Sequence, residues 1–579
     1  MANKKKKKQT KTPGQFTAEY FTKIVIGAYV FLMLCVYPLF FRLDSEMSGG
    51  GIVPHRYFDM GETKFAFFQW VTYLCLGLMI LAALYYAYVF NRDVSFFKAI
   101  KETSLTDRFA AAYFFACWLS FLLAENKELA LLGFQGWNMG FISQVFFILA
   151  LYFVSRFWQW SPTTLMCAVA AAAVTHQMGI LQRFKFDPLG MYVNVAPESV
   201  EKFVSTLGQT TWYSSYAVLI VPLGMYFYWS DERRWMRIAS AIYIALAFGM
   251  LVTTNSDSAY VAMVLIFMVF FRYSLESNER MKRFLEMAGI GLASMQIIGL
   301  MRALFPERTP KLITGDEKIT EFATHSPIFI VAFLIVVALY ILLRLYGEGG
   351  PMVKSGSGKK GFDISAHEKV IWRITLIAAC LVIGGVLIAI IVVTFHLLPE
   401  SVIPADSEIY KGSFFMFNDS WGNHRGFNWR MAVKALKNIF TGQGTGSFFT
   451  GLKDLLVGNG PDCFEIAMEK YCQPEVSQYW KGLKLACAHN EFLNLLVTGG
   501  ILGTVSYIGI MVSCFKECAS VVKKEPAVIA FMAAIPAYMG HNFFCYQQCI
   551  CTPILFILMG IGLMIVRSVR KEESQAAKN

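Results

Sequence analysis

A short stretch late in the chain contains the side chains best suited to phosphate and proton chemistry. Arg425 and Arg430 carry planar guanidinium groups, which grip phosphate oxygens in pairs and make them the better phosphate candidates beside neighbouring lysines. His489, followed by Asn490 and Glu491, is the side chain that most readily accepts a proton near neutral pH. His489 is therefore either a general base or a residue with a capping or packing role.

Alternating glycines lie between the arginines and the histidine, at Gly442, Gly444 and Gly446. A glycine-rich nucleotide-binding loop requires a preceding strand within a βαβ unit, whereas the residues before Gly442 follow a helical pattern. We interpret the glycines as a helix end and a tight turn, where the backbone can approach a bulky neighbour or a substrate.

The chain that must position these residues is far more apolar than a soluble protein. Of its 579 residues, 56% are hydrophobic and 16% are charged, against about 45–50% and about 25% in soluble domains. This composition excludes a disordered chain, a nucleic-acid-binding domain and an ordinary cytosolic enzyme. Apolar runs predict fourteen membrane-spanning helices, at residues 23–41, 66–90, 109–124, 139–155, 163–181, 211–229, 238–254, 259–272, 286–304, 327–346, 373–398, 490–513, 527–544 and 553–567.

Basic residues set the expected orientation. The run Lys4–Lys8, in a segment without a cleavable signal pattern, is expected to stay in the cytoplasm. Fourteen spans return Arg567, Arg570 and Lys571 to the same side. We therefore predict an all-α integral membrane protein with both termini cytoplasmic and one large extracytoplasmic loop in its C-terminal third. The net charge of +12 follows from this topology and from contact with anionic headgroups, so no nucleic acid is implied.

The predicted organisation has five parts. A basic cytoplasmic tail (1–22) precedes an eleven-helix body (23–398), a large extracytoplasmic loop (399–488), three C-terminal spans that open with His-Asn (489–568) and a cytoplasmic tail (569–579). A loop of this length is unusual unless it is functional or disordered, and its tryptophans and phenylalanines indicate that it is folded.

Within this loop we expect an amphipathic helix that begins at Trp429. Trp429, Val433, Leu436 and Phe440 recur at helical spacing and form one apolar stripe, with basic residues beside it. Such a helix is expected to lie at the membrane interface with its basic face toward the headgroups.

The cysteines leave two possibilities open. Of thirteen cysteines, those on the expected outer side are in an environment that permits disulfides, and Cys463–Cys472 is the first pair to test. The alternative is that they are free thiols. No spacing indicates a zinc site, and no acidic motif for a metal-bound sugar nucleotide is present, so we expect neither a metal nor a cofactor.

The arginine, glycine and His-Asn motifs, in this order along the chain, resemble the O-antigen ligase and O-antigen polymerase family of bacterial membrane glycosyltransferases. The family pattern is an arginine four residues before a tryptophan, an alternating glycine turn before a phenylalanine, and His-Asn at the entry to a helix with spaced leucines and glycines. The matching residues are Arg425, Trp429, Gly442, Gly444, Gly446, Phe448, His489, Asn490, Leu493, Leu496, Gly500 and Gly503.

Two segments further upstream match the family more loosely. The first contains Gln209 and Trp212, and the second is Thr253–Ala259. Family members often carry an arginine in the second segment, where this chain has Asp257. A cationic phosphate contact is therefore not carried over to this position. Asp257 either binds a sugar hydroxyl or is a solvated turn residue.

The resemblance implies glycan transfer from a polyprenyl diphosphate carrier, at the extracytoplasmic face of the bacterial plasma membrane. Arg425 and Arg430 would stabilise the leaving diphosphate, and His489 would take the proton of the acceptor hydroxyl. Asn490 and Glu491 would orient His489 or bind the sugar. The remaining residues assigned to substrate contact are Trp429, Gly442, Gly444, Gly446, Asp257, Gln209 and Trp212.

The implied partners are the lipid bilayer, the lipid-linked glycan donor and a glycan or surface-polymer acceptor. The motifs do not separate a ligase, which transfers to a surface anchor, from a polymerase, which extends another lipid-linked chain. The alternative from another class is a transporter or flippase of lipid-linked oligosaccharides. That alternative predicts ionisable side chains deep within the spans.

Overall fold

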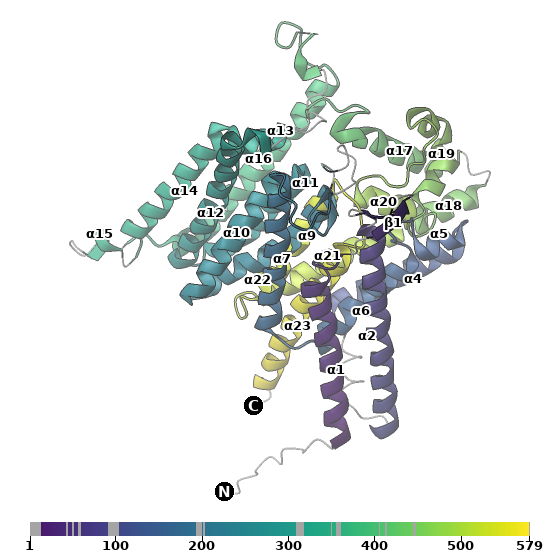
Figure 1. Cartoon of the computed structure of the whole chain (residues 1–579), viewed down its shortest axis with the longest axis horizontal. Helices are drawn as coiled ribbons and strands as arrows, with labels where there is room; N and C mark the ends of the chain where they lie inside the picture. Colours follow the sequence, from purple (N-terminus) through teal and green to yellow (C-terminus); the bar gives the residue numbers. More distant parts are fainter. Residues whose placement is uncertain are drawn as a thin grey trace.

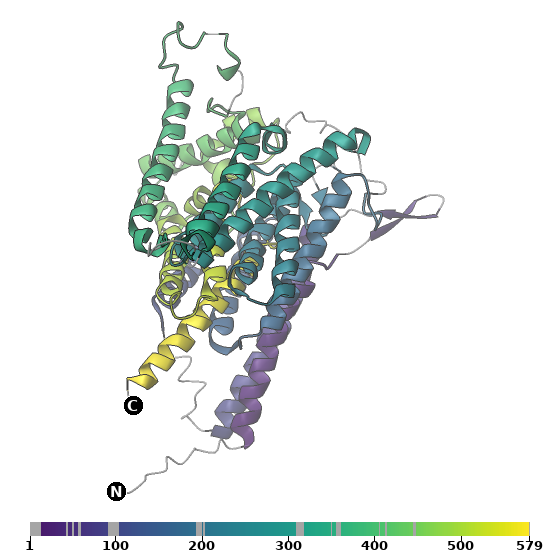
Figure 2. The same ribbon diagram turned by 90° about the vertical axis from the view of Figure 1, so that its left-hand side faces the viewer.

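The computed structural model describes residues 13–41, 44–48, 51–55, 60–90, 103–192, 200, 203–308, 318–348, 350–354, 361–404, 406–410, 414–443 and 447–577. These residues are almost entirely helical (Figures 1 and 2). Their only strands form two short antiparallel pairs, β1 (Asp44–Ser48) with β2 (Gly51–His55) and β3 (Phe203–Val204) with β4 (Gly208–Gln209). The predicted all-α class is confirmed.

A helix lies at each predicted span. These helices are α1 (Pro13–Phe31) with the π-helical turn η1 (Leu32–Val36), α2 (Met60–Phe90), α4 (Leu105–Leu123), α6 (Phe141–Phe157), α7 (Pro162–Arg183), α9 (Thr210–Ser230), α10 (Arg234–Thr254), α11 (Asp257–Ser274), α12 (Asn278–Leu304), α14 (Pro327–Tyr346), α16 (Glu368–Thr394), α20 (Glu491–Thr498) with α21 (Gly500–Ala519), α22 (Val528–Asn542) and α23 (Thr552–Ala576). The connecting elements are α5 (Lys127–Leu132), η2 (Pro306–Arg308), α13 (Lys318–His325), α15 (Pro351–Lys354), η3 (Ile364–His367), η4 (Glu408–Tyr410), α17 (Trp421–Thr441), α18 (Phe448–Val457) and α19 (Phe464–Tyr479).

Nine of the described helices are long and apolar enough to cross a membrane, namely α2, α7, α10, α11, α12, α14, α21, α23 and the segment Ile364–Thr394. Tyr20–Val36 and Phe141–Phe157 are shorter apolar helices. The other predicted spans coincide with α4, α9 and α22, which are helical but are not among the nine. In α14 no residue is buried, although nearly all of its side chains are apolar. An apolar surface of this size is stable against lipid and not against water, which supports a membrane protein.

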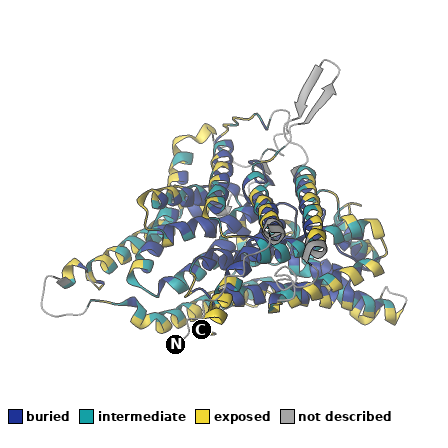
Figure 3. Cartoon of the chain, turned by 90° about the horizontal axis from the view of Figure 1, so that it is seen from below, coloured by how far each residue is buried: buried dark blue, intermediate teal, exposed yellow. Residues whose placement is uncertain are grey.

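The centre of the bundle is α9, most of whose residues are buried. It packs against α7, α10, α11 and α22. The C-terminal helices are part of the same body, because α21 packs on α4 and α23 packs on α6. Figure 3 shows the buried residues concentrated in the interior and the exposed ones on the outer helices. This packing places the late polar motifs against α4, α6 and α9.

The predicted span 490–513 is two helices and not one, so its predicted start is wrong, and the helix long and apolar enough to cross a membrane is Gly500–Ala519. α20 ends at Thr498 with Gly499 as its C-cap, and Gly500 has a φ of +63°. A Cβ atom on Gly500 would lie 2.5 Å from the carbonyl oxygen of Leu456. The close backbone neighbour and the left-handed conformation both require glycine here, and together they interrupt the helix.

The loop 399–488 is folded into α17, α18 and α19, which gather at one end of the molecule (Figure 1). α17 packs against α19 through a face that includes Met431, Ala435 and Ile439. The predicted apolar stripe is not the packing face, because Val433 and Phe440 are exposed. The pattern identified the helix correctly, and the place of its apolar stripe at the membrane interface stays a prediction, with which the exposed Val433 and Phe440 agree.

The Cys463–Cys472 disulfide is excluded. All thirteen cysteines are free, and Cys463 caps the start of α19 while Cys472 lies within it. The eight residues between them are helical, which places the two Cα atoms roughly 13 Å apart, well beyond the ~7 Å that a disulfide spans.

The predicted tails are partly helical. α1 already begins at Pro13 and α23 continues to Ala576. In Figures 1 and 2, the start of α1 and the end of α23 point to the same end of the molecule, away from α17 and α19.

Candidate functional site

His489 lies in a tight turn at the start of α20. Its φ of +51° is left-handed, and the next residue, Asn490, caps the helix by accepting a hydrogen bond from the Leu493 amide at 3.0 Å. The imidazole meets the ring of Tyr546 edge to face, with ring centroids 5.1 Å apart. Helix capping by Asn490 therefore fixes the backbone from which His489 projects.

Arg425 approaches this turn from α17. Its Nε donates to the carbonyl oxygen of Phe544 and its Nη1 to that of Gly422, both at 2.9 Å. Within the described part of the chain, no carboxylate pairs with Arg425. Burial, with the charge of Arg425 as the second cause, lowers the pKa of His489 to about 4. At neutral pH His489 is therefore an uncharged imidazole beside a cation whose charge is not neutralised.

Arg430 differs sharply from Arg425, although both belong to α17. Its Nε and Nη2 bind the two carboxylate oxygens of Asp419 at 2.8 and 2.6 Å, and about half of its side chain is exposed. The catalytic role predicted for Arg430 stays a prediction. Its charge is already balanced by Asp419.

The turn that follows α22 connects the predicted residues. Its Phe544 carbonyl holds Arg425, and its Tyr546 ring contacts His489. The Tyr546 hydroxyl accepts a hydrogen bond from Nε1 of Trp212, at 3.3 Å. Three predicted residues from distant parts of the sequence are thus held together by residues that the sequence motifs did not include.

A buried hydrogen-bond chain lies behind this turn. Asn542 donates through Nδ2 to the carboxylate of Glu491, so its Oδ1 faces Nδ1 of His541 at 3.0 Å. An amide oxygen only accepts, which places the imidazole proton on Nδ1. Nε2 of His541 lies 2.9 Å from Ser214 Oγ, whose hydroxyl also donates to the Thr211 carbonyl at 3.1 Å and contacts Ser256 Oγ at 2.9 Å. The chain fixes Glu491 relative to α9, α11 and α22.

The two upstream segments have different places in this arrangement. Gln209 lies at the end of β4, where its Oε1 accepts from the Thr211 hydroxyl at 3.2 Å, next to Trp212. Asp257 is exposed at the first position of α11, while its neighbour Ser256 belongs to the buried chain. In the second segment, Ser256 and not Asp257 therefore belongs to the buried hydrogen-bond chain.

Trp429 and the glycines have supporting positions. Trp429 lies against Phe544 and Trp421, with ring centroids 6.0 and 5.3 Å apart, so it packs against the turn that holds Arg425. Gly442 has a φ of +71° and ends α17, which confirms the predicted helix stop. Gly444 and Gly446 lie outside the described residues.

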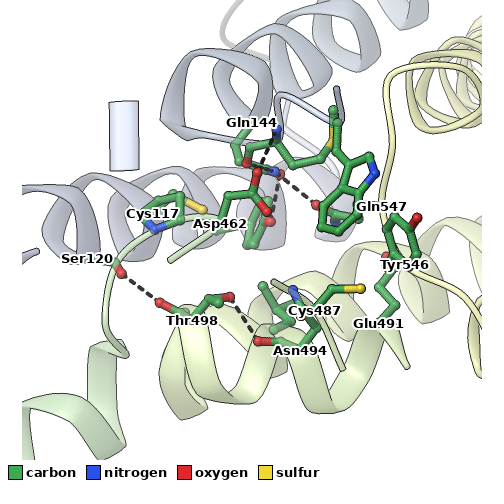
Figure 4. A pocket seen from close by; sticks show the side chains of 16 residues that line it. Cys117, Ser120, Gln144, Asp462, Cys487, Glu491, Asn494, Thr498, Tyr546 and Gln547 are labelled. Carbon is green, nitrogen blue, oxygen red and sulfur yellow. Dashed lines mark hydrogen bonds between the residues drawn. The ribbon is translucent and has the colours of Figure 1, made fainter. Parts of the chain in front are cut away.

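A pocket adjoins the cluster, with Tyr546 in its wall (Figure 4). It contains Asp462, a residue that the sequence motifs did not include. Asp462 Oδ2 accepts hydrogen bonds from the amides of Phe134 and Met139, at 2.7 and 3.1 Å. Burial is the main cause that raises the pKa of Asp462 to about 7. Glu491 lies in the wall of the same pocket.

One sequence signal could have found part of this arrangement. The dipeptide His541-Asn542 repeats His489-Asn490, and both pairs belong to the cluster. Asp462 has no such signal, because its partners come from a loop more than three hundred residues earlier in the chain.

The fold and this cluster define a helical membrane protein with a polar site at one end of its bundle. No protein-family model matches the chain, and no curated protein matches it. Among the residues that the structure describes, no group of three or more His, Cys, Asp or Glu side chains is arranged to hold a metal ion.

Proposed function

We propose that this protein transfers a glycan from a polyprenyl diphosphate carrier to an acceptor hydroxyl, as O-antigen ligases and polymerases do. The observation that carries the proposal is that Arg425 and His489 meet the same turn, Arg425 through the Phe544 carbonyl and His489 through the Tyr546 ring. A cation, whose described contacts are two backbone carbonyls, and a neutral imidazole are thus brought to one turn from different helical segments. This pair suits a reaction that releases an anion and consumes a hydroxyl proton.

In the proposed reaction, the acceptor oxygen attacks the anomeric carbon and the bond from that carbon to the diphosphate oxygen breaks. His489 takes the hydroxyl proton, and Arg425 stabilises the negative charge that gathers on the leaving diphosphate. Arg425 has a second effect, because its charge helps to keep His489 unprotonated and able to act as a base.

The proposal includes the topology of fourteen spans with both termini in the cytoplasm. It is supported by the helix found at each predicted span and by the common direction of the start of α1 and the end of α23. The site would then lie on the extracytoplasmic face of the bacterial plasma membrane, with α17, α18 and α19. Labelling of single introduced cysteines from outside the cell tests this orientation.

The deciding experiment uses purified protein in liposomes with a lipid-linked oligosaccharide from the native host. Products of the wild type and of His489→Ala are sized on a gel. A ladder made only by the wild type indicates a polymerase, and a single transfer that requires an added acceptor indicates a ligase. Full activity in His489→Ala contradicts the mechanism.

Transport is the second candidate, and the two buried ionisable side chains below bear on it, of which Lys64 precedes its predicted span and His176 lies within one. Lys64 is fully buried in α2, where its Nζ donates to the carbonyl oxygens of Tyr37 and Pro38 at 2.6 and 3.1 Å. His176 is fully buried in α7 against Tyr213. Movement of the donor between leaflets without glycan transfer, in the same liposomes, would identify a flippase.

A further inference from the structure

The backbone just before Arg425 has an unusual conformation. Three consecutive residues, Gly422, Asn423 and His424, have φ values of +59°, +57° and +68° and ψ values of +40°, +60° and +5°, which make one left-handed turn. L-residues avoid this conformation because their Cβ atom comes too close to the backbone, whereas glycine and, less readily, asparagine adopt it. Such residues persist only where surrounding contacts hold them, and they gather at functional sites.

Arg425 depends on this left-handed turn directly. It is the next residue in the chain, and its Nη1 donates to the carbonyl oxygen of Gly422 at 2.9 Å. Its Nε donates to the carbonyl oxygen of Phe544, in the turn after α22, also at 2.9 Å. The left-handed turn therefore supplies one of the two carbonyl oxygens that hold the guanidinium. A change in the backbone of the turn would move that acceptor.

One hydroxyl on the neighbouring helix ties the two sides of the left-handed turn together. Tyr479, the last residue of α19, donates its hydroxyl proton to the carbonyl oxygen of Asp419, before the turn, at 3.1 Å. The same hydroxyl oxygen lies 2.7 Å from Nδ1 of His424, the last residue of the turn. Because a hydroxyl has a single proton, Nδ1 of His424 donates in this second bond and the hydroxyl oxygen accepts.

The ring of Tyr479 is held independently of its hydroxyl. It stacks on the ring of Phe427, with centroids 3.8 Å apart and planes 7° from parallel. The next residue, Trp480, meets the imidazole of His424 with ring centroids 5.2 Å apart. α17 and α19 also pack against each other (Figure 1). Removal of the hydroxyl alone would therefore leave the packing of the ring in place while it frees the turn.

We infer that Tyr479 is a positioning residue for Arg425, an inference that rests on the proposed function. The hydroxyl of Tyr479 clamps the left-handed turn through Asp419 and His424. The clamped turn fixes the carbonyl of Gly422, and that carbonyl holds the guanidinium beside the turn that follows α22. Tyr479 thus acts through the backbone and not on the reacting atoms.

The variant Tyr479→Phe tests this inference, because it removes the hydroxyl and keeps the stacked ring. Its matched control is Tyr471→Phe on the same helix, whose hydroxyl donates to the carboxylate of Asp454 and not to the left-handed turn. Each variant removes one tyrosine hydroxyl from α19. An effect confined to Tyr479→Phe therefore comes from the turn and not from a general loosening of α19.

The position of Arg425 is measured without any substrate. The full chain is labelled with isotopic arginine in lipid nanodiscs, and NMR follows the exchange of the Arg425 Nε proton with solvent, its signal identified by its loss in Arg425→Lys. Tyr479→Phe is expected to speed this exchange about tenfold, because the guanidinium leaves the Phe544 carbonyl more often. Tyr471→Phe should leave the rate unchanged. An unchanged rate in Tyr479→Phe, or equal acceleration in both variants, would overturn the inference.

A transfer assay in liposomes separates this inference from the proposed function. Tyr479→Phe is expected to lower the rate about three- to tenfold, and this loss should disappear when Arg425 is already alanine, because two changes that act through one residue are not additive. A loss that persists in the Arg425→Ala background, or no loss at all, would overturn the positioning role. Faster proton exchange in Tyr479→Phe together with no transfer by the wild type would keep Tyr479 as the residue that positions Arg425 and reject glycan transfer.

Discussion

Two polar clusters lie toward opposite ends of α4, and they differ in how their charges are balanced. Near the start of α4, Asp107 pairs with Arg156 at 3.1 Å and with Arg567 at 2.5 Å. There too, Glu517 of α21 accepts hydrogen bonds from Thr106 and pairs with Arg570 at 3.2 Å. These pairs join α4, α6, α21 and α23, so that cluster ties the bundle together.

Toward the other end of α4, the charges are not balanced in this way. Arg425 contacts backbone carbonyls, and Asp462 and Glu491 line a pocket whose described walls contain no cation. Charge held away from water without an opposite charge lowers stability. The balanced cluster therefore serves the fold, whereas the unbalanced cluster suits ligands that bring the missing charges and hydrogen bonds.

The largest expected effect is on catalysis at the unbalanced cluster. Arg425→Ala and His489→Ala should each lower the rate of glycan transfer by about 10²- to 10³-fold, because each removes a group that acts on the transition state. The liposome assay measures the rate. Wild-type expression and melting temperature are the controls, and near-normal transfer in either variant would remove the distinction between the clusters.

The largest expected effect on stability is at the balanced cluster. Asp107→Ala leaves Arg156 buried without its carboxylate, which should cost about 3–5 kcal/mol of unfolding free energy. The side chain of Arg156 is only 1% exposed, so water cannot replace the lost partner. Thermal unfolding in detergent measures the change. Transfer per folded molecule should stay normal, and a selective loss of activity would give this cluster a functional role.

The pH dependence gives a smaller test. His489 has its pKa lowered from 6.5 to about 4, so it should remain neutral above about pH 5 and transfer should fall only as the pH drops through about 4. In the unfolded chain His489 takes up its proton near pH 6.5, whereas in the folded chain it does so only near pH 4. The free energy of unfolding should therefore fall as the pH is lowered from about 6.5 to about 4.

A rate profile between about pH 4 and pH 8, corrected for unfolding at each pH, measures this dependence. Asp462→Asn is the control, because the pKa of Asp462 near 7 adds its own titration in the wild type. A midpoint near 6.5 that persists in Asp462→Asn would contradict the assignment of a neutral base at His489.

The smallest expected effect is at Arg430. Its pair with Asp419 is about half exposed, and exposed pairs contribute about 0–1 kcal/mol to stability. Arg430→Ala should therefore change transfer less than about threefold and shift the melting temperature little. Arg430→Ala and Arg425→Ala should be compared in the same assay, because both arginines belong to α17. Equal losses in both variants would restore Arg430 to the catalytic site.

The positions of the helices could be predicted from the sequence because the bilayer restricts what an apolar segment can form. Backbone groups in lipid must bond within the segment, so each run of about twenty apolar residues becomes a helix wherever it packs. The break at Gly500 could not be predicted, because it depends on the backbone of Leu456 close beside it. For the same reason, the periodicity of α17 gave the helix but not the face that packs.

Residue types and hydropathy were enough to predict a helical membrane protein and to select Arg425, Trp212 and His489 as candidate site residues. The folded chain was needed to show that these three meet at the turn 542–546, that Arg430 is balanced by Asp419, and that a pocket with two carboxyl groups adjoins Tyr546. The difference comes from the distance along the chain over which each interaction acts. Hydropathy and helix capping act between near neighbours in the chain, whereas ion pairing, burial and the pKa of His489 depend on groups that folding brings together from distant segments.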